Sequence, residues 1–350
     1  MNLDLKNKEW TEFLISDIFN ISGTFTTHPS KLKKGGLTPR VTCAATNNGF
    51  ENTYKNKPTE KGGVITIDSA TVGYVSFQPY DFIATDHVEK ISLKNNRLIN
   101  KYLGAFLVRA ISSATLNKYG YGYKFSQTRI AKQKIILPIN QKGEPDFEFM
   151  EAFMKQKEQE KFQEYNDYIS QRIKTLKDFK SVEPIEEKEW AEFFIADVSE
   201  ILSGRDIYGS ERIKGNTPYI SATANNNGIG HFVGNDNPTK ESGCLSVNRN
   251  GSVGYSFYHP YEALFGNDCR KLRPKNPSKH VGIFISQQIT RQRGKYGYGY
   301  KMGTARLKRQ KIMLPVNDQN EPDYDYMENY MKQLEYNKLN EYLKVKKTTR

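Results

Sequence analysis

The pattern of hydrophobic and polar residues divides the chain into two kinds of segment. Short β-branched and aromatic runs, broken by Gly-Gly and Asn-Gly pairs, follow Trp10 and again Trp190. These runs predict strands joined by tight turns. From Asp146 and from Asp323 the chain becomes rich in Glu, Lys and Gln and contains no Gly or Pro for the next 25 or more residues. Each strand-rich segment is therefore followed by a polar stretch of different character.

The polar stretches carry apolar residues mostly three and four positions apart, which is the spacing of one helix face. This spacing predicts helices from Asp146 to about Lys180 and from Asp323 to about Lys347. Pairing of the two apolar stripes in a two-stranded coiled coil is favoured over two unrelated surface helices. The stripes are Phe149, Phe153, Phe162, Tyr165, Ile169, Ile173 and Leu176, and Met327, Met331, Leu334, Leu339, Tyr342 and Leu343.

The whole pattern occurs twice, about 180 residues apart. EWTEFLISDIFNISG, from Glu9, returns as EWAEFFIADVSEILSG, from Glu189. KYGYGYKFSQTRIAKQKIILPIN, from Lys118, returns as KYGYGYKMGTARLKRQKIMLPVN, from Lys295, with 14 of 23 positions identical. This period exceeds that of solenoid repeats, about 20 to 50 residues, and indicates two homologous domains in tandem.

We expect an α+β chain divided into four parts. They are a first domain over 1–145, a long helix over 146–183, a second domain over 184–322 and a second long helix over 323–350. Pro184 supports the end of the first helix, because the residue before a proline disfavours the helical conformation.

The chain is basic, with 52 Lys and Arg against 39 Asp and Glu and a net charge of +13. Two equivalent segments without acidic residues, Lys118 to Lys134 and Arg291 to Lys311, carry five and eight positive residues. This concentration favours a polyanionic partner that contacts both domains, over a basic surface without a partner.

The Tyr-Gly-Tyr-Gly-Tyr core of each basic segment suits contacts with phosphate. Glycine lets the backbone approach a partner closely, while tyrosine hydroxyls and flanking cations can meet phosphate oxygens. A plain hairpin would show the same alternation. Such contacts position a DNA duplex without reading its bases. The predicted DNA-backbone residues are Lys118, Tyr119, Tyr121, Tyr123, Lys124 and Arg129, and Lys295, Tyr296, Tyr298, Tyr300, Lys301 and Arg306.

Base reading needs paired donors and acceptors, and we look for them where the two copies disagree. Three loops qualify: Asp68 to Thr71 against Asn248 to Ser252, Thr85 to His87 against Asn267 to Arg270, and Thr26 to Lys33 against Arg205 to Arg212. Ordinary divergence of loops is the competing explanation. The Asn-Asn-Gly pairs at Asn47 and Asn226 are more simply hairpin turns. The candidate base-reading residues are Asp68, Ser69, Thr71, His87, Arg205, Arg212, Asn248, Arg249, Asn250 and Arg270.

Signatures of catalysis and of a metal site are missing from the sequence. It contains no phosphate-binding loop, no HExxH and no Asn/Asp-Pro-Pro-aromatic motif of an amino-methyltransferase. The nearest nuclease-like pattern, Pro145-Asp146 with Asp178-Phe179-Lys180, would place its carboxylates about 48 Å apart on one helix. Cys43, Cys244 and Cys269 lack zinc-ligand spacing and suit a reducing, cytoplasmic compartment.

Taken in order, these segments resemble the specificity subunits of Type I restriction-modification systems and of the related BcgI-like Type IIB enzymes. The resemblance rests on the two EW-containing starts, the two GYGYK segments that close the domains and the long helix after each. The EPDFEFMEAFM and EPDYDYMENYM entries to the helices are closer to the BcgI-like branch, whereas Type I subunits tend to have LPPLxEQ there. The choice between the two systems stays open at this stage.

The resemblance implies two α/β target-recognition domains, separated by two long antiparallel helices in a pseudo-two-fold arrangement. Each domain would read one half of a bipartite, asymmetric double-stranded DNA site. The helices would recruit DNA adenine methyltransferase subunits and, in some systems, restriction subunits. No cofactor is expected on this chain itself, and S-adenosylmethionine and Mg²⁺ would bind to the partners. Membranes are not expected to take part.

Two other functions are weighed against this interpretation. A stand-alone DNA-binding or anti-restriction protein would occupy DNA without enzyme partners, whereas a recruiting subunit needs apolar docking residues, for which Met154 and Phe179 are the candidates. A self-sufficient nuclease is disfavoured because its catalytic residues are missing. We therefore expect a recognition subunit without catalytic residues.

Overall fold

The structure is a computed structural model that describes the backbone of residues 3–348 and the side chains of residues 3–345. It contains two compact units, Met1–Tyr165 and Asn166–Arg350, each with its own core. The division into 1–145, 146–183, 184–322 and 323–350 stays a prediction. Its residues 1–2 and 349–350 lie outside the described part of the chain.

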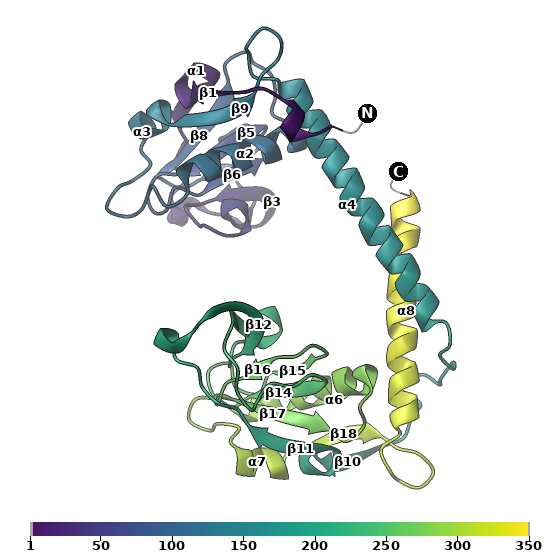
Figure 1. The fold of residues 1–350 in the computed structure, drawn as a ribbon. Coiled ribbons are helices and arrows are strands. Elements are labelled where there is room, and N and C mark those ends of the chain that lie inside the picture. The colour runs from purple at the N-terminus through teal and green to yellow at the C-terminus, as the bar shows by residue number, and fades with distance from the viewer. Residues whose placement is uncertain (1–2, 349–350) are drawn as a thin grey trace. The chain divides into compact units, whose positions relative to one another are not determined.

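Three sheets form the first unit within the described residues (Figure 1). Their strand orders are β2-β8-β5-β6, β4-β3-β7 and β1-β9, and all neighbouring strands are antiparallel except β3 and β7. The strands are β1 (Trp10–Leu14), β2 (Phe19–Gly23), β3 (Lys34–Val41), β4 (Phe50–Tyr54), β5 (Val64–Asp68), β6 (Val75–Gln78), β7 (Ile83–Ala84), β8 (Val88–Leu93) and β9 (Lys134–Pro138). The helices are η1 (Leu5–Asn7), α1 (Ile15–Ile18), η2 (Pro29–Lys31), η3 (Asn47–Gly49), α2 (Lys101–Thr115), α3 (Gln127–Lys132) and the first part of α4 (Phe147–Leu176).

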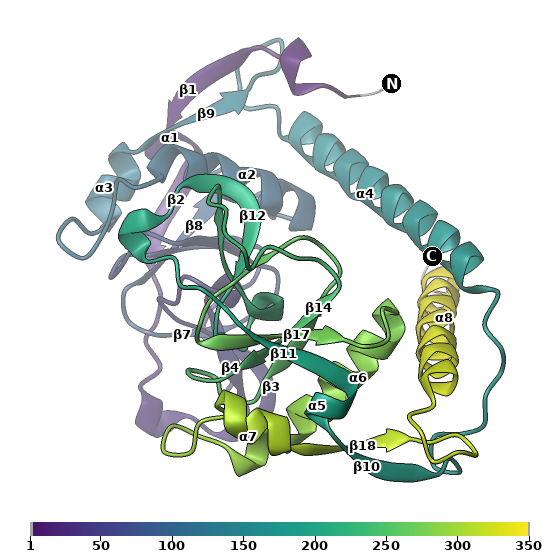
Figure 2. The same cartoon turned by 60° about the horizontal axis from the view of Figure 1, so that its bottom comes forward.

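The second unit repeats this topology strand for strand, with the orders β11-β17-β14-β15, β13-β12-β16 and β10-β18 (Figure 2). The repeat confirms both the duplication and the α+β fold. The strands are β10 (Trp190–Phe194), β11 (Ser199–Ser203), β12 (Lys214–Ile220), β13 (Ile229–Val233), β14 (Cys244–Asn248), β15 (Ser256–His259), β16 (Leu264–Phe265), β17 (Cys269–Pro274) and β18 (Lys311–Pro315). The helices are α5 (Ile195–Val198), η4 (Gly209–Glu211), η5 (Asn226–Gly228), α6 (Lys279–Arg291), η6 (Gln292–Lys295), α7 (Thr304–Arg309) and α8 (Tyr324–Thr348).

One helix in each unit, α2 or α6, packs on the four-stranded sheet through a glycine. A Cβ atom at Gly104 would lie 2.5 Å from Cγ of Phe77, and one at Gly282 would lie 2.4 Å from Cδ2 of Tyr258. Neither glycine has a positive φ, so close packing and not backbone conformation requires it. The aromatic ring of the sheet therefore lies directly against the helix backbone in both units.

The two long helices begin where the sequence predicts and are capped in the same way. Oδ1 of Asp146 accepts a hydrogen bond from the Phe149 amide at 3.0 Å, and Oδ1 of Asp323 accepts one from the Tyr326 amide at 2.9 Å. A carboxylate at this position satisfies a free amide of the first helical turn. Asp146 also pairs with Lys8 at 2.7 Å, so the nuclease-like Pro145-Asp146 sequence has a structural role.

The predicted pairing of the two apolar stripes is only partly right. Phe149 and Phe153 pack in the first core, and Met327 and Met331 pack in the second. Leu334, another member of the predicted stripe, is 42% exposed. The first turns of each helix therefore seal the domain that precedes them, because the sheet and α2 or α6 leave apolar surface that needs cover.

Within the second unit, the part of α4 from Asn166 onward lies beside α8, and the two helices run in opposite directions (Figure 1). Ile169, Ile173 and Leu176 are buried in this part of α4. The helix ends at Leu176 rather than near Lys180, and the Lys180 amide donates instead to Oδ1 of Asn329 in α8 at 2.8 Å. No helix within residues 3–348 is long and apolar enough to cross a membrane.

Candidate nucleic-acid interface

The two Tyr-Gly segments form the same tight hairpin between the long core helix and the short helix that follows it. Gly120 and Tyr123 exchange backbone hydrogen bonds of 3.2 and 3.0 Å, and Gly297 and Tyr300 exchange bonds of 3.2 and 3.1 Å. The hairpin that the sequence left as an alternative is thus present. A hairpin is compatible with a binding role, because its geometry determines which side chains are exposed to a partner.

The first tyrosine of each hairpin is an internal support. The Tyr119 ring stacks on Phe125, with centroids 4.0 Å apart, and its hydroxyl donates to Oε1 of Gln133 at 3.0 Å. In the second unit the Tyr296 hydroxyl donates to Oε1 of Gln310 at 2.5 Å. Burial raises the pKa of both tyrosines. Their hydroxyls are therefore already engaged.

The third tyrosine is held by an arginine. The guanidinium carbons of Arg129 and Arg306 each lie 3.9 Å from the ring centroid of Tyr123 or Tyr300. Arg129 also donates from Nη1 to the Lys124 carbonyl at 2.7 Å, and Arg306 makes the matching bond at 2.8 Å. Each arginine thus ties its hairpin to the following helix and already has partners within the chain.

The middle tyrosine is exposed, as are the basic residues beside it except Lys301, which is half-buried. Tyr121 is 87% exposed and Tyr298 is 88% exposed. Nζ of Lys124 lies 6.0 Å from the Tyr121 ring centroid, and Nζ of Lys301 lies 5.3 Å from that of Tyr298. Lys118 is exposed, as is Lys295, whose Nζ donates to Gln292 at 2.9 Å. The most exposed ring of each hairpin therefore lies beside two basic side chains, and the third ring is about half exposed, at 54% for Tyr123 and 52% for Tyr300.

Some of the concentrated charge is neutralised within the chain. Lys134 pairs with Glu12 and Lys311 pairs with Glu192, each at 2.8 Å. The Arg293 guanidinium lies 4.6 Å from the Tyr255 ring centroid. The surplus charge is thus smaller than the sequence suggests, since each lysine reaches a glutamate of the paired strand, although in the register Lys134 lies opposite Leu14 and Lys311 opposite Phe194.

Two of the three divergent loops, Asp68 to Thr71 and Thr85 to His87, come together in the first unit. The Ser69 hydroxyl donates to the His87 carbonyl at 2.9 Å, and the Cys43 thiol lies 3.4 Å from that same oxygen. A Cβ at Gly73, in the loop after Asp68, would lie 3.3 Å from side-chain atoms of both Tyr119 and Phe125. The loop between β5 and β6 therefore rests on the base of the hairpin.

Several candidate base readers in the first unit already serve their own loop. Asp68 is 3% exposed, and its carboxylate accepts hydrogen bonds from the backbone amides of residues 70, 71 and 72 and from the Thr71 hydroxyl. Burial acts to raise the pKa of Asp68, but these hydrogen bonds outweigh it and hold the pKa below its ordinary value. Ser69 is 5% exposed. His87 differs, because its side chain is exposed and its backbone adopts a φ of 61°.

The second unit separates its candidates in the same way. Asn248 is fully buried and donates to the Thr223 carbonyl at 3.0 Å. Arg270 is 7% exposed and donates from Nε to the Thr304 hydroxyl at 2.7 Å, and burial lowers its pKa. Arg249 and Asn250 both contact Oδ1 of Asp268, at 3.2 and 3.4 Å. Asn248 and Arg270 are thus buried and bonded within the chain, whereas Arg249 and Asn250 are half-buried.

Arg205 and Arg212 are the exposed arginines of this group. Within the described residues the Arg205 side chain has no hydrogen-bond or ion-pair partner, whereas Arg212 donates to the Ile207 carbonyl at 3.3 Å and contacts His231 at 2.7 Å. A cavity of about 300 Å³ lies here, lined by polar groups of Asp206, Arg212 and Asp268 among others. The Arg212 side chain thus lines the same recess as two carboxylates, and Arg205 is not part of its lining.

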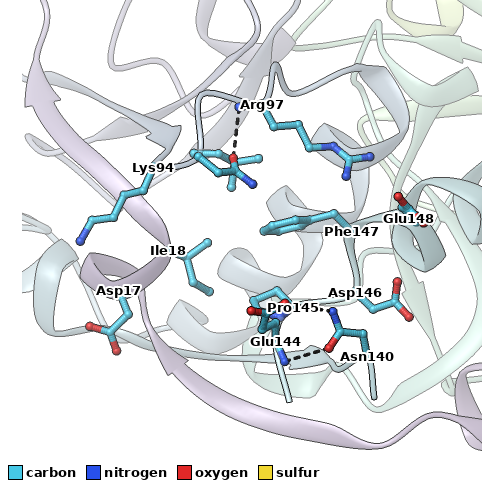
Figure 3. A pocket seen from close by; sticks show the side chains of 12 residues that line it. Asp17, Ile18, Lys94, Arg97, Asn140, Glu144, Pro145, Asp146, Phe147 and Glu148 are labelled. Atoms are coloured by element: carbon cyan, nitrogen blue, oxygen red, sulfur yellow. Dashed lines mark hydrogen bonds between the residues drawn. The ribbon is translucent and has the colours of Figure 1, made fainter. Parts of the chain in front are cut away.

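The first unit contains a larger cavity of about 570 Å³ (Figure 3). Its polar side chains bond within the chain: Asn140 to Glu144, and Arg97 to Glu151 at 2.6 Å. Within the described residues, no cluster of His, Cys, Asp and Glu side chains could hold a metal ion. We assign no ligand to this cavity.

The two predicted docking residues are half-buried and contact other residues of the chain. Met154 lines an apolar cavity of about 440 Å³ with Trp10, Phe106 and Ile136, beside the first core. The Phe179 ring lies 5.4 Å from that of Tyr336. Trp10 and Ile136, which the sequence did not single out, are more exposed, at 39% and 55%.

Gln133 and Gln310 anchor the hairpins and were missed by the sequence analysis. Each is 7% exposed, accepts from the first tyrosine and donates back to the carbonyl of the next lysine. Their identity in the two copies was the available signal. The reason for it, a buried amide that joins hairpin and strand, needs the tertiary contact.

Comparison with known proteins gives one consistent result. The Type I restriction modification DNA specificity domain matches the chain twice, over residues 7–167 and 187–346. The S.BcgI specificity subunit of a Type II restriction enzyme from Heyndrickxia coagulans is 34% identical over 344 residues, covering 93% of this chain and 95% of that protein. The S subunit of a Type I restriction-modification system from M. genitalium has a similar fold, with a TM-score of 0.56 at 15% identity, covering 98% of this chain and 94% of that one.

Proposed function

Because the chain belongs to the Type I restriction-modification DNA specificity family, we propose that each of its units reads one half of a bipartite, asymmetric double-stranded DNA site. Members of this family are recognition components of restriction-modification systems and not their catalytic subunits. The chain is accordingly a specificity subunit and not an enzyme.

One observation carries the two-half-site proposal: the units share their hairpins but not their reading loops. Tyr121 and Lys124 have direct counterparts in Tyr298 and Lys301. In contrast, the loop after β5 is organised by the buried Asp68, and the matching loop after β14 carries Arg249 and Asn250 on Asp268. Hairpin residues that are the same in both units suit contacts with the DNA backbone, which is the same everywhere. Loops that differ between the units suit contacts with two different base sequences.

We also propose that the long helices recruit DNA adenine methyltransferase subunits, and restriction subunits where the system has them. S-adenosylmethionine and Mg²⁺ would bind to those partners. A methyltransferase must take its target base out of the stack, which makes a separate recognition subunit useful. Met154 and Phe179 stay the proposed docking residues, with Trp10 and Ile136 as exposed neighbours of Met154.

Methylation mapping tests this function. The chain is co-expressed with the methyltransferase encoded beside it, and methylated adenines are mapped across the host genome. We expect one motif with two specified halves and an unspecified spacer. A single continuous motif, or methylation unchanged when the chain is omitted, would contradict the proposal. Cleavage of DNA by the purified chain with Mg²⁺ alone would contradict its non-catalytic role.

A further inference from the structure

Of the three tyrosines in each hairpin, the middle one is the most exposed, at 87% for Tyr121 and 88% for Tyr298, against 54% for Tyr123 and 52% for Tyr300. Tyr119 and Tyr123 stack on each other, with centroids 5.7 Å apart and planes 1° apart, and Tyr296 and Tyr300 do so at 5.7 Å and 13°. Tyr121 and Tyr298 point away from these stacks and are almost fully exposed. The middle ring is the most exposed one in both hairpins, although different residues follow them, Phe125 in the first unit and Met302 in the second.

The surroundings of the exposed ring suit a negatively charged partner with apolar surface. An ammonium group lies near each ring, and the basic segments contain no acidic residue. A Cβ atom at Gly120, Gly122, Gly297 or Gly299 would meet no atom within 4 Å. The backbone on both sides of the tip is therefore open to close approach by another molecule.

The hairpin also stands next to the loops that we assign to base reading. The loop after β5 contacts Tyr119 and Phe125 through Gly73. In the second unit, a Cβ at Gly254 would lie 2.7 Å from Cβ of Arg293, just before the hairpin. If a DNA duplex binds to these loops, its sugar-phosphate backbone would thus contact the tip of the hairpin.

Resting on the proposed function, we propose that Tyr121 and Tyr298 are the DNA anchors of their units, each packing its ring against the deoxyribose wall beside the bases that are read. The ring supplies apolar contact, and Lys124 or Lys301 supplies the charge. The arginine clamp and the stacked tyrosines hold the tip in place before binding, which reduces the ordering that binding requires. Such an anchor acts on every sequence alike.

The test measures duplex affinity of the full-length chain over a range of salt concentrations, for DNA that carries the mapped site and for unrelated DNA. For Tyr121→Ala we expect affinity to fall on the order of tenfold on both DNAs, as for loss of an aromatic contact to nucleic acid. The slope of log K against log salt should not change, because no charge is removed. Tyr121→Phe should stay close to the wild type, and Tyr298→Ala should match Tyr121→Ala.

Two control variants distinguish the contribution of the Tyr121 ring from that of another exposed tyrosine and that of the neighbouring charge. Tyr80→Ala removes another exposed tyrosine, 74% exposed, from the first unit and should leave affinity unchanged. Lys124→Ala should lower affinity and reduce the salt slope by about one. Thermal unfolding of Tyr121→Ala should match the wild type, because the ring is exposed.

Three results would overturn the anchor. They are an unchanged affinity in Tyr121→Ala, an equal loss in Tyr121→Phe, which would assign the contact to the hydroxyl, and a loss confined to the specific site. Failure of the wild-type chain to bind any duplex would instead defeat the proposed function, and the anchor with it.

Discussion

Arg172, near the end of α4, forms a two-pronged ion pair with Glu335 of α8, with Nε to Oε1 at 2.6 Å and Nη2 to Oε2 at 2.9 Å. Nε2 of His280, from α6, lies 3.1 Å from the same carboxylate. Hydrogen bonding to Arg172 is the main reason that the pKa of Glu335 falls to about 2. One carboxylate thus joins three helices of the second unit.

Arg172→Ala should lower the free energy of unfolding by about 1–2 kcal/mol, because it removes charge-assisted hydrogen bonds from a partly buried carboxylate. Urea unfolding of the full chain measures the change. Lys338→Ala removes an exposed ion pair with Glu341 from α8 and should have no measurable effect. Equal effects of the two substitutions would show that the Arg172 pair adds nothing to stability.

Stability should fall on acidification in two steps. Burial lowers the pKa of His259 from 6.5 to about 4, so its stabilisation is complete above pH 6.5 and is lost as pH falls toward 4. Glu335, with its pKa lowered from 4.5 to about 2, loses its contribution between pH 4.5 and 2. Unfolding followed from pH 8 to about 2 measures both steps. In His259→Gln the loss of stability between pH 6.5 and 4 should be smaller. An unchanged loss would mean that other groups cause this step.

Lys118→Ala with Lys124→Ala should weaken binding to all DNA sequences and reduce the salt slope by about two, since each exposed ammonium that meets a phosphate contributes about 0.9. The matched control is Lys134→Ala, because that ammonium already pairs with Glu12. Affinity measured from 50 to 200 mM salt gives the slopes. A change at one base position alone would mean that these lysines read sequence.

Arg205→Ala should relax the specificity of the second half-site at one position, by about 1–3 kcal/mol if its guanidinium contacts a guanine. Asn248→Ala should instead lower stability, because Asn248 is buried and bonded to the Thr223 carbonyl. Methylation profiles of both variants, together with thermal unfolding, distinguish these outcomes. A change in the first half-site would contradict independent reading by the two units.

Exchanging the whole Asn248 to Ser252 loop should change only the second half-site, since this loop rests on elements of its own unit. Mapped motifs of the parent and the exchanged chain give the answer. Loss of both half-sites together would count against modular recognition.

The sequence by itself determined the duplication, the α+β class, the family and the starts of the long helices. These properties depend on local signals, such as the repeated GYGYK segments, the Asn-Asn-Gly turns and the capping residues Asp146 and Asp323. Each signal acts within a few residues of the chain or is visible as a repeat. For that reason they can be predicted before any contact between distant residues is known.

Only the tertiary structure decided which polar side chains are available to a partner. Asp68, Asn248 and Arg270 were candidate base readers in the sequence on the same grounds as Arg205, yet all three are buried. Asn248 and Arg270 are also bonded to residues far away in the chain, Thr223 and Thr304. Tyr119, Tyr121 and Tyr123 alternate identically with glycine, and packing alone makes the middle ring the most exposed, at 87% against 54% for Tyr123. Burial and hydrogen-bond satisfaction depend on residues far apart in the chain, so a local pattern does not contain them.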